Sequence, residues 1–225
     1  MSIFVQKVVN DWGETTYVPT AAGLIVLIVL MIAVLLAGVA FFGKQRKSSA
    51  KQIAFSSLAI ALATVASFIK IIHMPMGGSV TLLSMLFIVL VGYWYGLGAG
   101  LTAAFAYGIL QLAIDPYILT IPQMLVDYIF AFSALGLSGI FSKANKNGLT
   151  KGYILGVLGR YFFAFISGWI FFGAYAGDYG FSSAVIYSLA YNGAYLGLEA
   201  LITLIIINIP AVKRALEYVK RLATE

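Results

Sequence analysis

Residues 117–128 read Tyr-Ile-Leu-Thr-Ile-Pro-Gln-Met-Leu-Val-Asp-Tyr, and the chain then continues without another charge to Phe141. Asp127 is therefore a single carboxylate inside a long apolar and aromatic segment. A charge at such a depth in a membrane is costly and marks a functional candidate. Because the segment is also long enough to cross a bilayer as a helix, it predicts an integral membrane protein with a functional carboxylate.

The composition of the whole chain agrees with a membrane protein. Of its 225 residues, 62% are hydrophobic and only 10% are charged, which is typical of a chain that crosses the bilayer several times. The chain has no cysteine and a single histidine, His73, so disulfides and multi-histidine metal sites are excluded, and we expect no cofactor. The net charge of +6 comes from bases between hydrophobic runs, which indicates membrane orientation and not nucleic-acid binding.

Hydropathy predicts seven membrane helices. They cover residues 20–43, 53–69, 80–95, 98–114, 121–141, 152–175 and 184–209. No charged n-region and no small-residue cleavage site accompany the first, so we expect a retained helix and not a signal peptide. The predicted fold is an all-α integral membrane bundle of six helices in residues 51–210. It is preceded by residues 1–50 with the additional helix and followed by a cytoplasmic tail, residues 211–225.

Basic residues predict the orientation of these helices. Three basic clusters follow the first, fifth and seventh predicted helices, so all three lie on one side of the membrane. The positive-inside rule assigns that side to the cytoplasm. We therefore expect a multi-pass protein of the cell membrane, surrounded by lipid, with its N-terminus outside and its C-terminus in the cytoplasm.

No soluble-enzyme signature is present in the sequence. It contains no Walker loop, no GxSxG and no HExxH, and residues 92–100, Gly-Tyr-Trp-Tyr-Gly-Leu-Gly-Ala-Gly, are typical of a tight turn between two helices. We therefore predict a protein that is not an enzyme. Any nucleotide-driven motor that it uses must be a different chain.

Polar groups within the predicted helices indicate a ligand site near the outer face. A carboxylate at Asp127 suits a cationic or amino-bearing ligand, and tyrosines nearby offer stacking faces and hydroxyls. Asn192 carries a donor and an acceptor, which suits the edge of a heteroaromatic ring. Hydrogen bonding between helices is the alternative role of both residues. The candidate ligand-binding residues are Asp127, Tyr128, Tyr117, Tyr187, Asn192, Phe172 and Gln123.

Two further charges, Arg160 and Glu199, lie deeper in the predicted bundle. Each is about nine or ten residues from the cytoplasmic end of its helix, which places them at a similar depth. Because isolated charges in hydrocarbon are costly, we expect them to form a buried ion pair. Its expected role is structural, with ligand contact as the alternative.

Small residues recur at a spacing of four in the segment 53–69. The pairs are Ser57 with Ala61 and Ala59 with Ala63, and such stripes let another helix approach closely. The partner is either a helix of this chain or a helix of a second subunit, and the pattern alone favours neither.

Several segments together carry a resemblance to a known family. They are Met-Pro-Met-Gly-Gly-Ser-Val-Thr-Leu-Leu-Ser-Met at 74–85, Tyr-Gly-Ile-Leu-Gln at 107–111, residues 117–119, 123–128 and 160–163, and Tyr-Ser-Leu-Ala-Tyr-Asn-Gly at 187–193. In this order they resemble the thiamine-specific S-components of energy-coupling factor (ECF) transporters. The resemblance covers about residues 51–210, so the first predicted helix lies outside it.

The resemblance implies a six-helix substrate-binding subunit that captures a vitamin from outside. Such a subunit docks on a shared module of one transmembrane coupling subunit and two ATPases. The binding residues that the resemblance implies are Asp127, Tyr128, Tyr117, Tyr187 and Asn192. The docking surface that it implies is the small-residue helix with Ala59, Ala63, Ser57 and Ala61.

The chain departs from the family pattern at four positions of the implied pocket. Asp127 stands where the family has glutamate. Ala164 stands where it has histidine, and Phe172 and Gly78 stand where it has tryptophan. Because a pocket with fewer stacking and hydrogen-bonding groups can prefer a related ring, hydroxymethylpyrimidine, pyridoxine or another vitamin are alternatives to thiamine.

A stand-alone proton-coupled carrier is the alternative from a different class. In such a carrier Asp127, Glu199 and Arg160 would form the proton path. The sequence shows no internal repeat of the kind that builds many such carriers, and its small-residue stripe favours a docked subunit.

Overall fold

The computed structural model describes residues 3–9, 15–26, 29, 49–144 and 146–225. Most of the predicted helix over residues 20–43 lies outside the described residues, and of its first part residues 21–26 are helical. An antiparallel hairpin precedes it, made of strands β1 (Val5–Val9) and β2 (Thr15–Pro19), with Val5 opposite Pro19.

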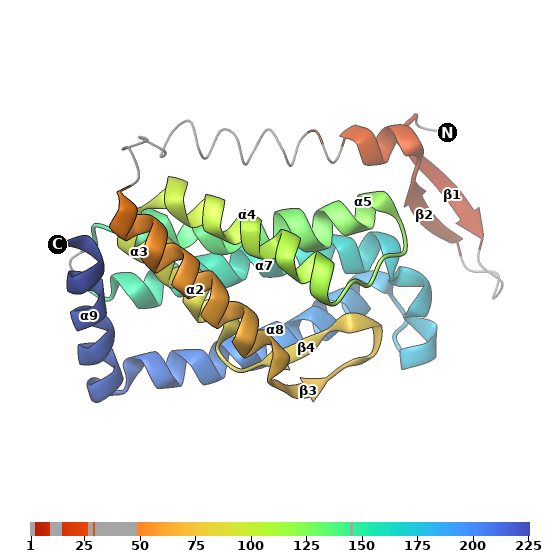
Figure 1. The fold of residues 1–225 in the computed structure, drawn as a ribbon. Coiled ribbons are helices and arrows are strands. Elements are labelled where there is room, and N and C mark those ends of the chain that lie inside the picture. The colour runs from red at the N-terminus through yellow and green to blue at the C-terminus, as the bar shows by residue number, and fades with distance from the viewer. Residues whose placement is uncertain (1–2, 10–14, 27–28, 30–48, 145) are drawn as a thin grey trace.

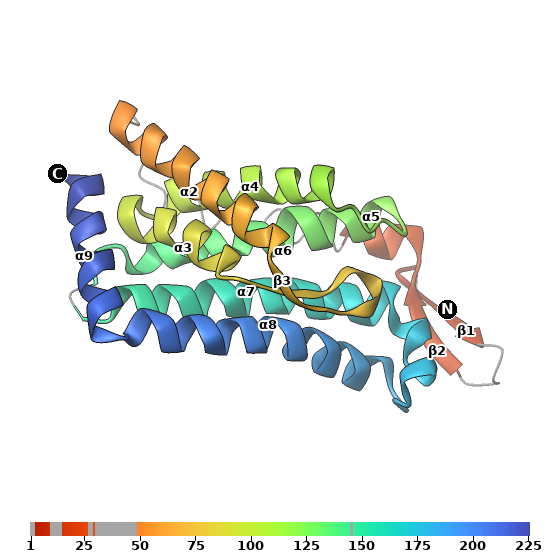
Figure 2. The same cartoon turned by 60° about the horizontal axis from the view of Figure 1, so that its bottom comes forward.

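The chain from residue 50 onward forms a bundle of helices (Figures 1 and 2). Within the described residues, five helical segments are long and apolar enough to cross a membrane. They are α2 (Ala50–Phe68), α4 (Leu97–Ile114), the segment Ile121–Phe141, α7 (Gly148–Phe171) and α8 (Ala184–Asn208). A shorter apolar helix, α3 (Ser84–Tyr95), is largely buried among them. The positions of these six helices agree with the hydropathy prediction to within four residues at each end.

The segment Ile121–Phe141 is not a uniform α-helix. It runs through α5 (Ile121–Met124), a π-helical stretch over Leu125–Phe130, α6 (Ala131–Ser133) and a 3-10 stretch over Ala134–Phe141. π-helical turns are rare and often lie at functional sites. This one contains Asp127, so the irregular turn and the lone carboxylate coincide.

Two glycines of the 3-10 stretch allow it to approach α4 closely. A Cβ atom at Gly136 would lie 2.4 Å from the backbone nitrogen of Leu101, and one at Gly139 would lie 2.3 Å from that of Leu97. Both distances are far below van der Waals contact, so neither position accepts a side chain without moving a backbone. These glycines therefore set the spacing of two helices that border the interior of the bundle.

A second antiparallel hairpin joins α2 to α3, where the sequence predicted only helices and a loop. Its strands are β3 (Lys70–His73) and β4 (Ser79–Thr81), with a 3-10 turn at Pro75–Gly77 between them. The all-α prediction is wrong for both hairpins, because each has strands of five residues or fewer that leave no hydropathy signal of bilayer length.

Residues Pro210–Thr224 form helix α9, where the sequence predicted a tail. α9 follows α8 after the single residue Ile209 and crosses one end of the bundle (Figure 1). Its Lys220 donates a hydrogen bond to the Ser142 carbonyl oxygen (2.8 Å) and lies 3.7 Å from the centre of the Tyr93 ring. These contacts pack α9 onto the bundle, and the resulting burial lowers the pKa of Lys220.

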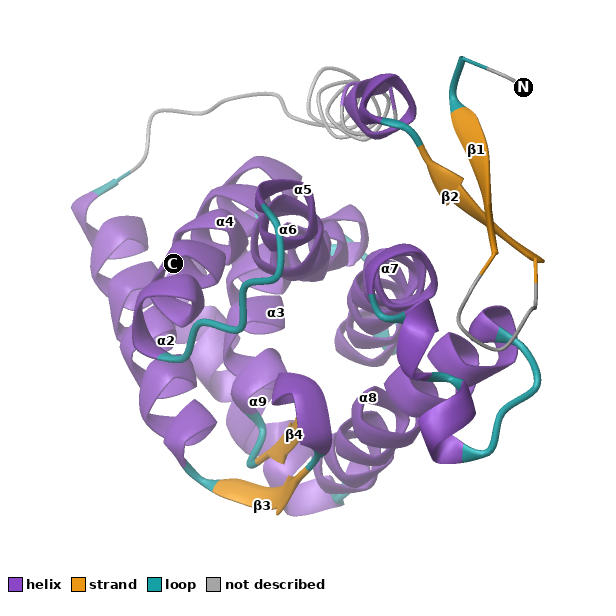
Figure 3. Ribbon diagram, turned by 90° about the vertical axis from the view of Figure 1, so that its right-hand side faces the viewer, coloured by secondary structure: helices purple, strands orange, loops and turns teal. Residues whose placement is uncertain are grey.

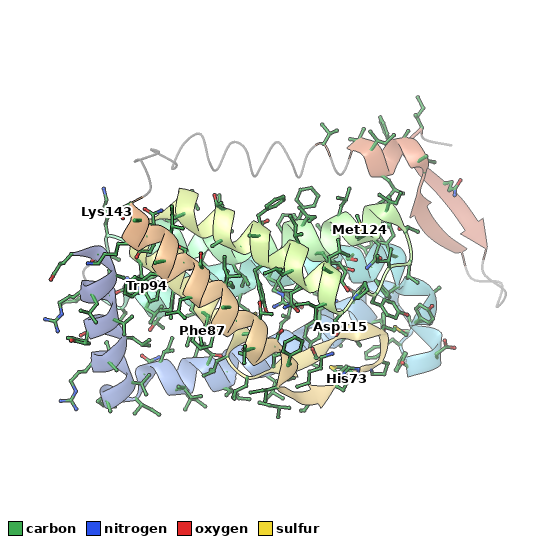
Figure 4. All side chains as sticks on the ribbon, in the orientation of Figure 1. His73, Phe87, Trp94, Asp115, Met124 and Lys143 are labelled. Atoms are coloured by element: carbon green, nitrogen blue, oxygen red, sulfur yellow. The ribbon has the colours of Figure 1, made fainter. Side chains whose placement is uncertain are left out.

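The two ends of the bundle therefore differ. We call them the hairpin end, which carries β3 and β4, and the α9 end. Figure 4 places His73 and Asp115 at the hairpin end, and Trp94 and Lys143 at the α9 end. Figure 3 looks along the bundle from the hairpin end and shows β3 and β4 lying beside α2 and α8.

Candidate ligand-binding site

A cavity of about 360 Å³ lies inside the bundle towards the hairpin end. The structure brings all seven predicted ligand residues to its wall: Asp127, Tyr128, Tyr117, Tyr187, Asn192, Phe172 and Gln123. It also places Arg160, Glu199, Ala164 and Gly78 there. Residues that are far apart in the sequence thus line the same cavity.

Gln123 holds Asp127 in position. The Gln123 side-chain nitrogen donates to the Asp127 carboxylate (2.6 Å) and to the Tyr117 carbonyl oxygen (3.1 Å), while its oxygen accepts from the Leu119 backbone N–H (2.9 Å). Gln123 is 1% exposed and its carboxamide is fully engaged. We therefore assign Gln123 the role of orienting the carboxylate, one helical turn away.

Tyr128 and Tyr117 form the wall next to Asp127. The Tyr128 hydroxyl accepts from the Tyr117 backbone N–H (2.7 Å) and donates to the Asp115 carbonyl oxygen (3.0 Å), which fixes the connection between α4 and α5. The Tyr117 ring stacks on Phe172 of the neighbouring segment, with ring centres 5.9 Å apart. An aromatic surface therefore stands beside the carboxylate.

Three tyrosines of α8 form a column along the cavity wall. The ring centres of Tyr187 and Tyr191 are 5.8 Å apart, and those of Tyr191 and Tyr195 are 5.7 Å apart. Tyr195 is not among the predicted residues, although its spacing of four from Tyr191 is the signal that places both on one helix face. Tyr195 donates to the side-chain oxygen of Asn192 (3.1 Å), whose nitrogen donates to the Ala164 carbonyl oxygen (3.2 Å).

The predicted ion pair between Arg160 and Glu199 is not formed. Glu199 instead accepts from the Thr81 N–H (2.9 Å), the hydroxyls of Thr81 (2.7 Å) and Ser84 (3.2 Å), and the Met85 N–H (3.4 Å). One backbone N–H of β4, one at the start of α3 and two hydroxyls thus satisfy the carboxylate. The prediction failed because the hairpin that supplies these donors was not foreseen.

Arg160 lies over the Phe132 ring, with its guanidinium carbon 4.1 Å from the ring centre. Among the described residues, the one ion pair within 4 Å is Lys70–Asp115 (2.5 Å), which joins β3 to the end of α4. Counted by formal charge, two basic groups (Lys70 and Arg160) and three acidic groups (Asp115, Asp127 and Glu199) line the cavity. The cavity wall therefore carries a formal charge of −1 and complements a monocation.

The small-residue pairs of α2 point in different directions. Ala59 and Ala63 are 3% and 0% exposed and lie in the core of the bundle, where the Ala63 carbonyl oxygen is 3.4 Å from the Tyr107 hydroxyl. For these two alanines the internal alternative is correct, and the expected docking role is wrong. Ser57 and Ala61 are exposed on the other face of α2.

Comparison with known proteins shows which family has this arrangement. The model of the thiamine transporter protein family (Thia_YuaJ) matches residues 52–218. The chain belongs to the thiamine transporter family. The match covers the six helices, the cavity and most of α9, and it confirms the resemblance found in the sequence.

Individual members of the thiamine transporter family are similar to the chain as well. The thiamine transporter ThiT of Bacillus subtilis is 36% identical over 156 residues, which cover 61% of this chain and 80% of that protein. ThiT of Lacticaseibacillus paracasei is 29% identical over 130 residues, covering 51% and 64%. The structure of ThiT from Listeria monocytogenes superimposes with a TM-score of 0.57 at 29% identity, over 71% of this chain and 94% of that chain.

Membership in this family settles the broad class of the protein. It is a multi-pass membrane protein of a transporter family and not an enzyme, as the sequence predicted. The cavity described above lies within the matched residues, so its chemistry bears on the transported ligand.

Proposed function

We propose that the protein is the substrate-binding subunit of an ECF-type transporter and that its ligand is thiamine. The observation that carries the proposal is the cavity itself, with aromatic walls, an oriented carboxylate at Asp127 and a formal charge of −1. Thiamine joins an aminopyrimidine to a thiazolium ring with a permanent positive charge. A negative, aromatic cavity complements both parts.

Each side of the cavity has a counterpart in this ligand. The Asp127 carboxylate, which can only accept hydrogen bonds when ionised, suits the exocyclic amino group or the charge of the thiazolium. The stacked pair Tyr117 and Phe172 offers a flat surface to an aromatic ring. Ala164 and Gly78 line the cavity without a side-chain hydrogen-bonding group, so we expect selectivity to rest on charge and stacking.

Selectivity between thiamine and the alternatives is testable by calorimetric titration of the purified protein. We expect thiamine to bind tightest, and hydroxymethylpyrimidine and pyridoxine to bind more weakly because neither carries a permanent positive charge. Oxythiamine, which has a carbonyl oxygen in place of the amino group, separates the roles of amino group and ring charge. Tighter binding of pyridoxine or hydroxymethylpyrimidine than of thiamine contradicts the assignment.

We also propose that transport energy reaches the protein from an ATPase module through α2. The chain has no nucleotide-binding motif, so it needs a partner for ATP-driven uptake. The exposed face of α2, with Ser57 and Ala61 among its small residues, permits close approach of a partner helix. This face replaces Ala59 and Ala63 as the proposed docking surface.

The proposed orientation places the hairpin end outside the cell. The α9 end carries Lys143, and α9 itself carries Lys213, Arg214, Lys220 and Arg221. The positive-inside rule assigns such an end to the cytoplasm. The cavity then lies towards the outside, where a vitamin is captured.

A further inference from the structure

The turn between β3 and β4 forms part of the cavity wall at the hairpin end. Met76, Gly77, Gly78 and Ser79 line the cavity from this turn. The Met74 N–H donates to the Gly78 carbonyl oxygen (2.8 Å), so the turn is a closed unit. A ligand in the cavity therefore lies beside this turn.

A single hydroxyl on α8 ties this turn down. The Tyr191 hydroxyl accepts from the Gly78 N–H (3.1 Å) and donates to the Pro75 carbonyl oxygen. One turn earlier on α8, the Tyr187 hydroxyl lies 3.2 Å from the Met76 sulfur, a weaker contact. Both hydrogen bonds of Tyr191 therefore hold backbone groups of this turn.

The contact with Tyr191 explains why position 78 is a glycine, whereas the backbone angles of Gly78 do not require one. Gly78 has φ −63° and ψ 138°, which any residue adopts. However, a Cβ atom there would lie 2.5 Å from the Tyr191 hydroxyl oxygen and 3.0 Å from the ring carbon that bears it. Gly77, with φ +89°, is by contrast required by the turn itself. Gly78 therefore makes room for the Tyr191 phenol.

The two strands of the β3–β4 hairpin are each held, at the end away from the turn, by a residue other than Tyr191. Glu199 binds Thr81 at the end of β4, and Asp115 pairs with Lys70 at the start of β3. The hairpin is therefore anchored at its base whether or not Tyr191 is bonded, and only the turn 74–79 depends on the phenol.

We propose that Tyr191 is a positioning residue whose hydroxyl clasps the turn 74–79 over the cavity and so sets how long a ligand is retained. The ligand leaves when both hydrogen bonds open and the turn lifts. The proposal rests on the proposed function for the identity of the ligand, which is thiamine, and it concerns the rate of release.

The first test compares Tyr191→Phe with the wild-type protein in two measurements. Release of radiolabelled thiamine into excess unlabelled thiamine should become about tenfold faster, since two hydrogen bonds to the turn are lost. Hydrogen–deuterium exchange of segment 74–79, which includes the Gly78 N–H, should also become faster. Tyr161→Phe is the matched control, because it removes a tyrosine hydroxyl that donates to the α8 backbone at Leu189 (3.1 Å), away from the turn.

The two measurements separate the possible failures. Unchanged release in Tyr191→Phe contradicts the proposal that Tyr191 retains the ligand. Faster release with unchanged exchange of segment 74–79 also contradicts it, because Tyr191 would then act by contacting the ligand directly. If the wild-type protein does not bind thiamine, the proposed function fails, while the exchange measurement still decides whether Tyr191 holds the turn.

A second test changes the other partner of the contact between Tyr191 and Gly78, by adding a methyl group at position 78. Gly78→Ala should displace the phenol and speed both release and exchange in the wild-type background. In a Tyr191→Ala background the added methyl group meets no phenol, so Gly78→Ala should change neither rate further. Equal effects of Gly78→Ala in both backgrounds contradict the clasp, because such effects do not pass through Tyr191.

Discussion

Asp127 and Gln123 act together at one turn of the segment Ile121–Phe141. The Gln123 carboxamide donates a hydrogen bond to the carboxylate, and Asp127 lines the cavity. A charge that is oriented before the ligand arrives loses less entropy on binding, and this favours affinity.

Replacement of Asp127 by asparagine should weaken thiamine binding by about 1.5–3 kcal/mol, the range of a hydrogen bond to a charged group. Asp178→Asn is the control, because Asp178 is exposed in a connection and does not line the cavity. Titration calorimetry measures both variants. Equal affinities of Asp127→Asn and the wild-type protein would remove Asp127 from the binding site.

At the residue scale the sequence predicted the members of the cavity wall better than their partners. Asp127 was recognisable because a lone charge in an apolar segment is expensive. The pairing of Glu199 was not, since depth along two helices says nothing about donors from an unforeseen hairpin. Thr81 and Ser84 satisfy Glu199, and Arg160 lies over Phe132 instead.

Helix α2 has two faces with different roles. Ala59 and Ala63 lie in the core, while Ser57 and Ala61 are exposed beside Leu58, Leu62 and Val65. In the sequence, both faces carry a pair of small residues at a spacing of four, so the spacing does not distinguish them. The packing of α3 and α4 against α2 decides which face is internal, and a single sequence does not contain that information.

A bulky side chain should therefore impair uptake when it stands on the exposed face of α2, and lower stability when it stands on the buried face. Ala61→Trp should leave thermal stability and thiamine affinity unchanged and abolish uptake and co-purification with the ATPase module, because it keeps the partner helix away. Ala63→Trp should lower stability by about 1–3 kcal/mol or more through overpacking. Full uptake by Ala61→Trp contradicts docking through this face.

Elements of bilayer length were predictable and shorter elements were not. Hydropathy located all six helices of the bundle because each is a continuous apolar run. It missed β3 and β4, whose strands have four residues or fewer. It also missed α9, which is amphipathic and not apolar, although Val212, Leu216, Val219 and Ala223 recur at helical spacing on its packed face.

Within the described residues, the polar cavity at the hairpin end is the candidate binding site, and the sequence carries no nucleotide-binding motif with which to drive transport. Its buried charges are fixed by separate partners: Gln123 holds Asp127, and Thr81 and Ser84 hold Glu199. Among the described residues, neither carboxylate forms a hydrogen bond with Arg160, as a proton path through the three groups would require. The arrangement therefore favours a capture subunit over a proton-coupled carrier.

Transport by the purified protein in liposomes tests this conclusion most directly. With labelled thiamine outside, the protein alone should bind the vitamin and accumulate none, with or without a proton gradient. Addition of the ATPase module and ATP should start accumulation, and Ala61→Trp should prevent it. Accumulation by the protein alone, driven by a proton gradient, would contradict the assignment as a substrate-binding subunit.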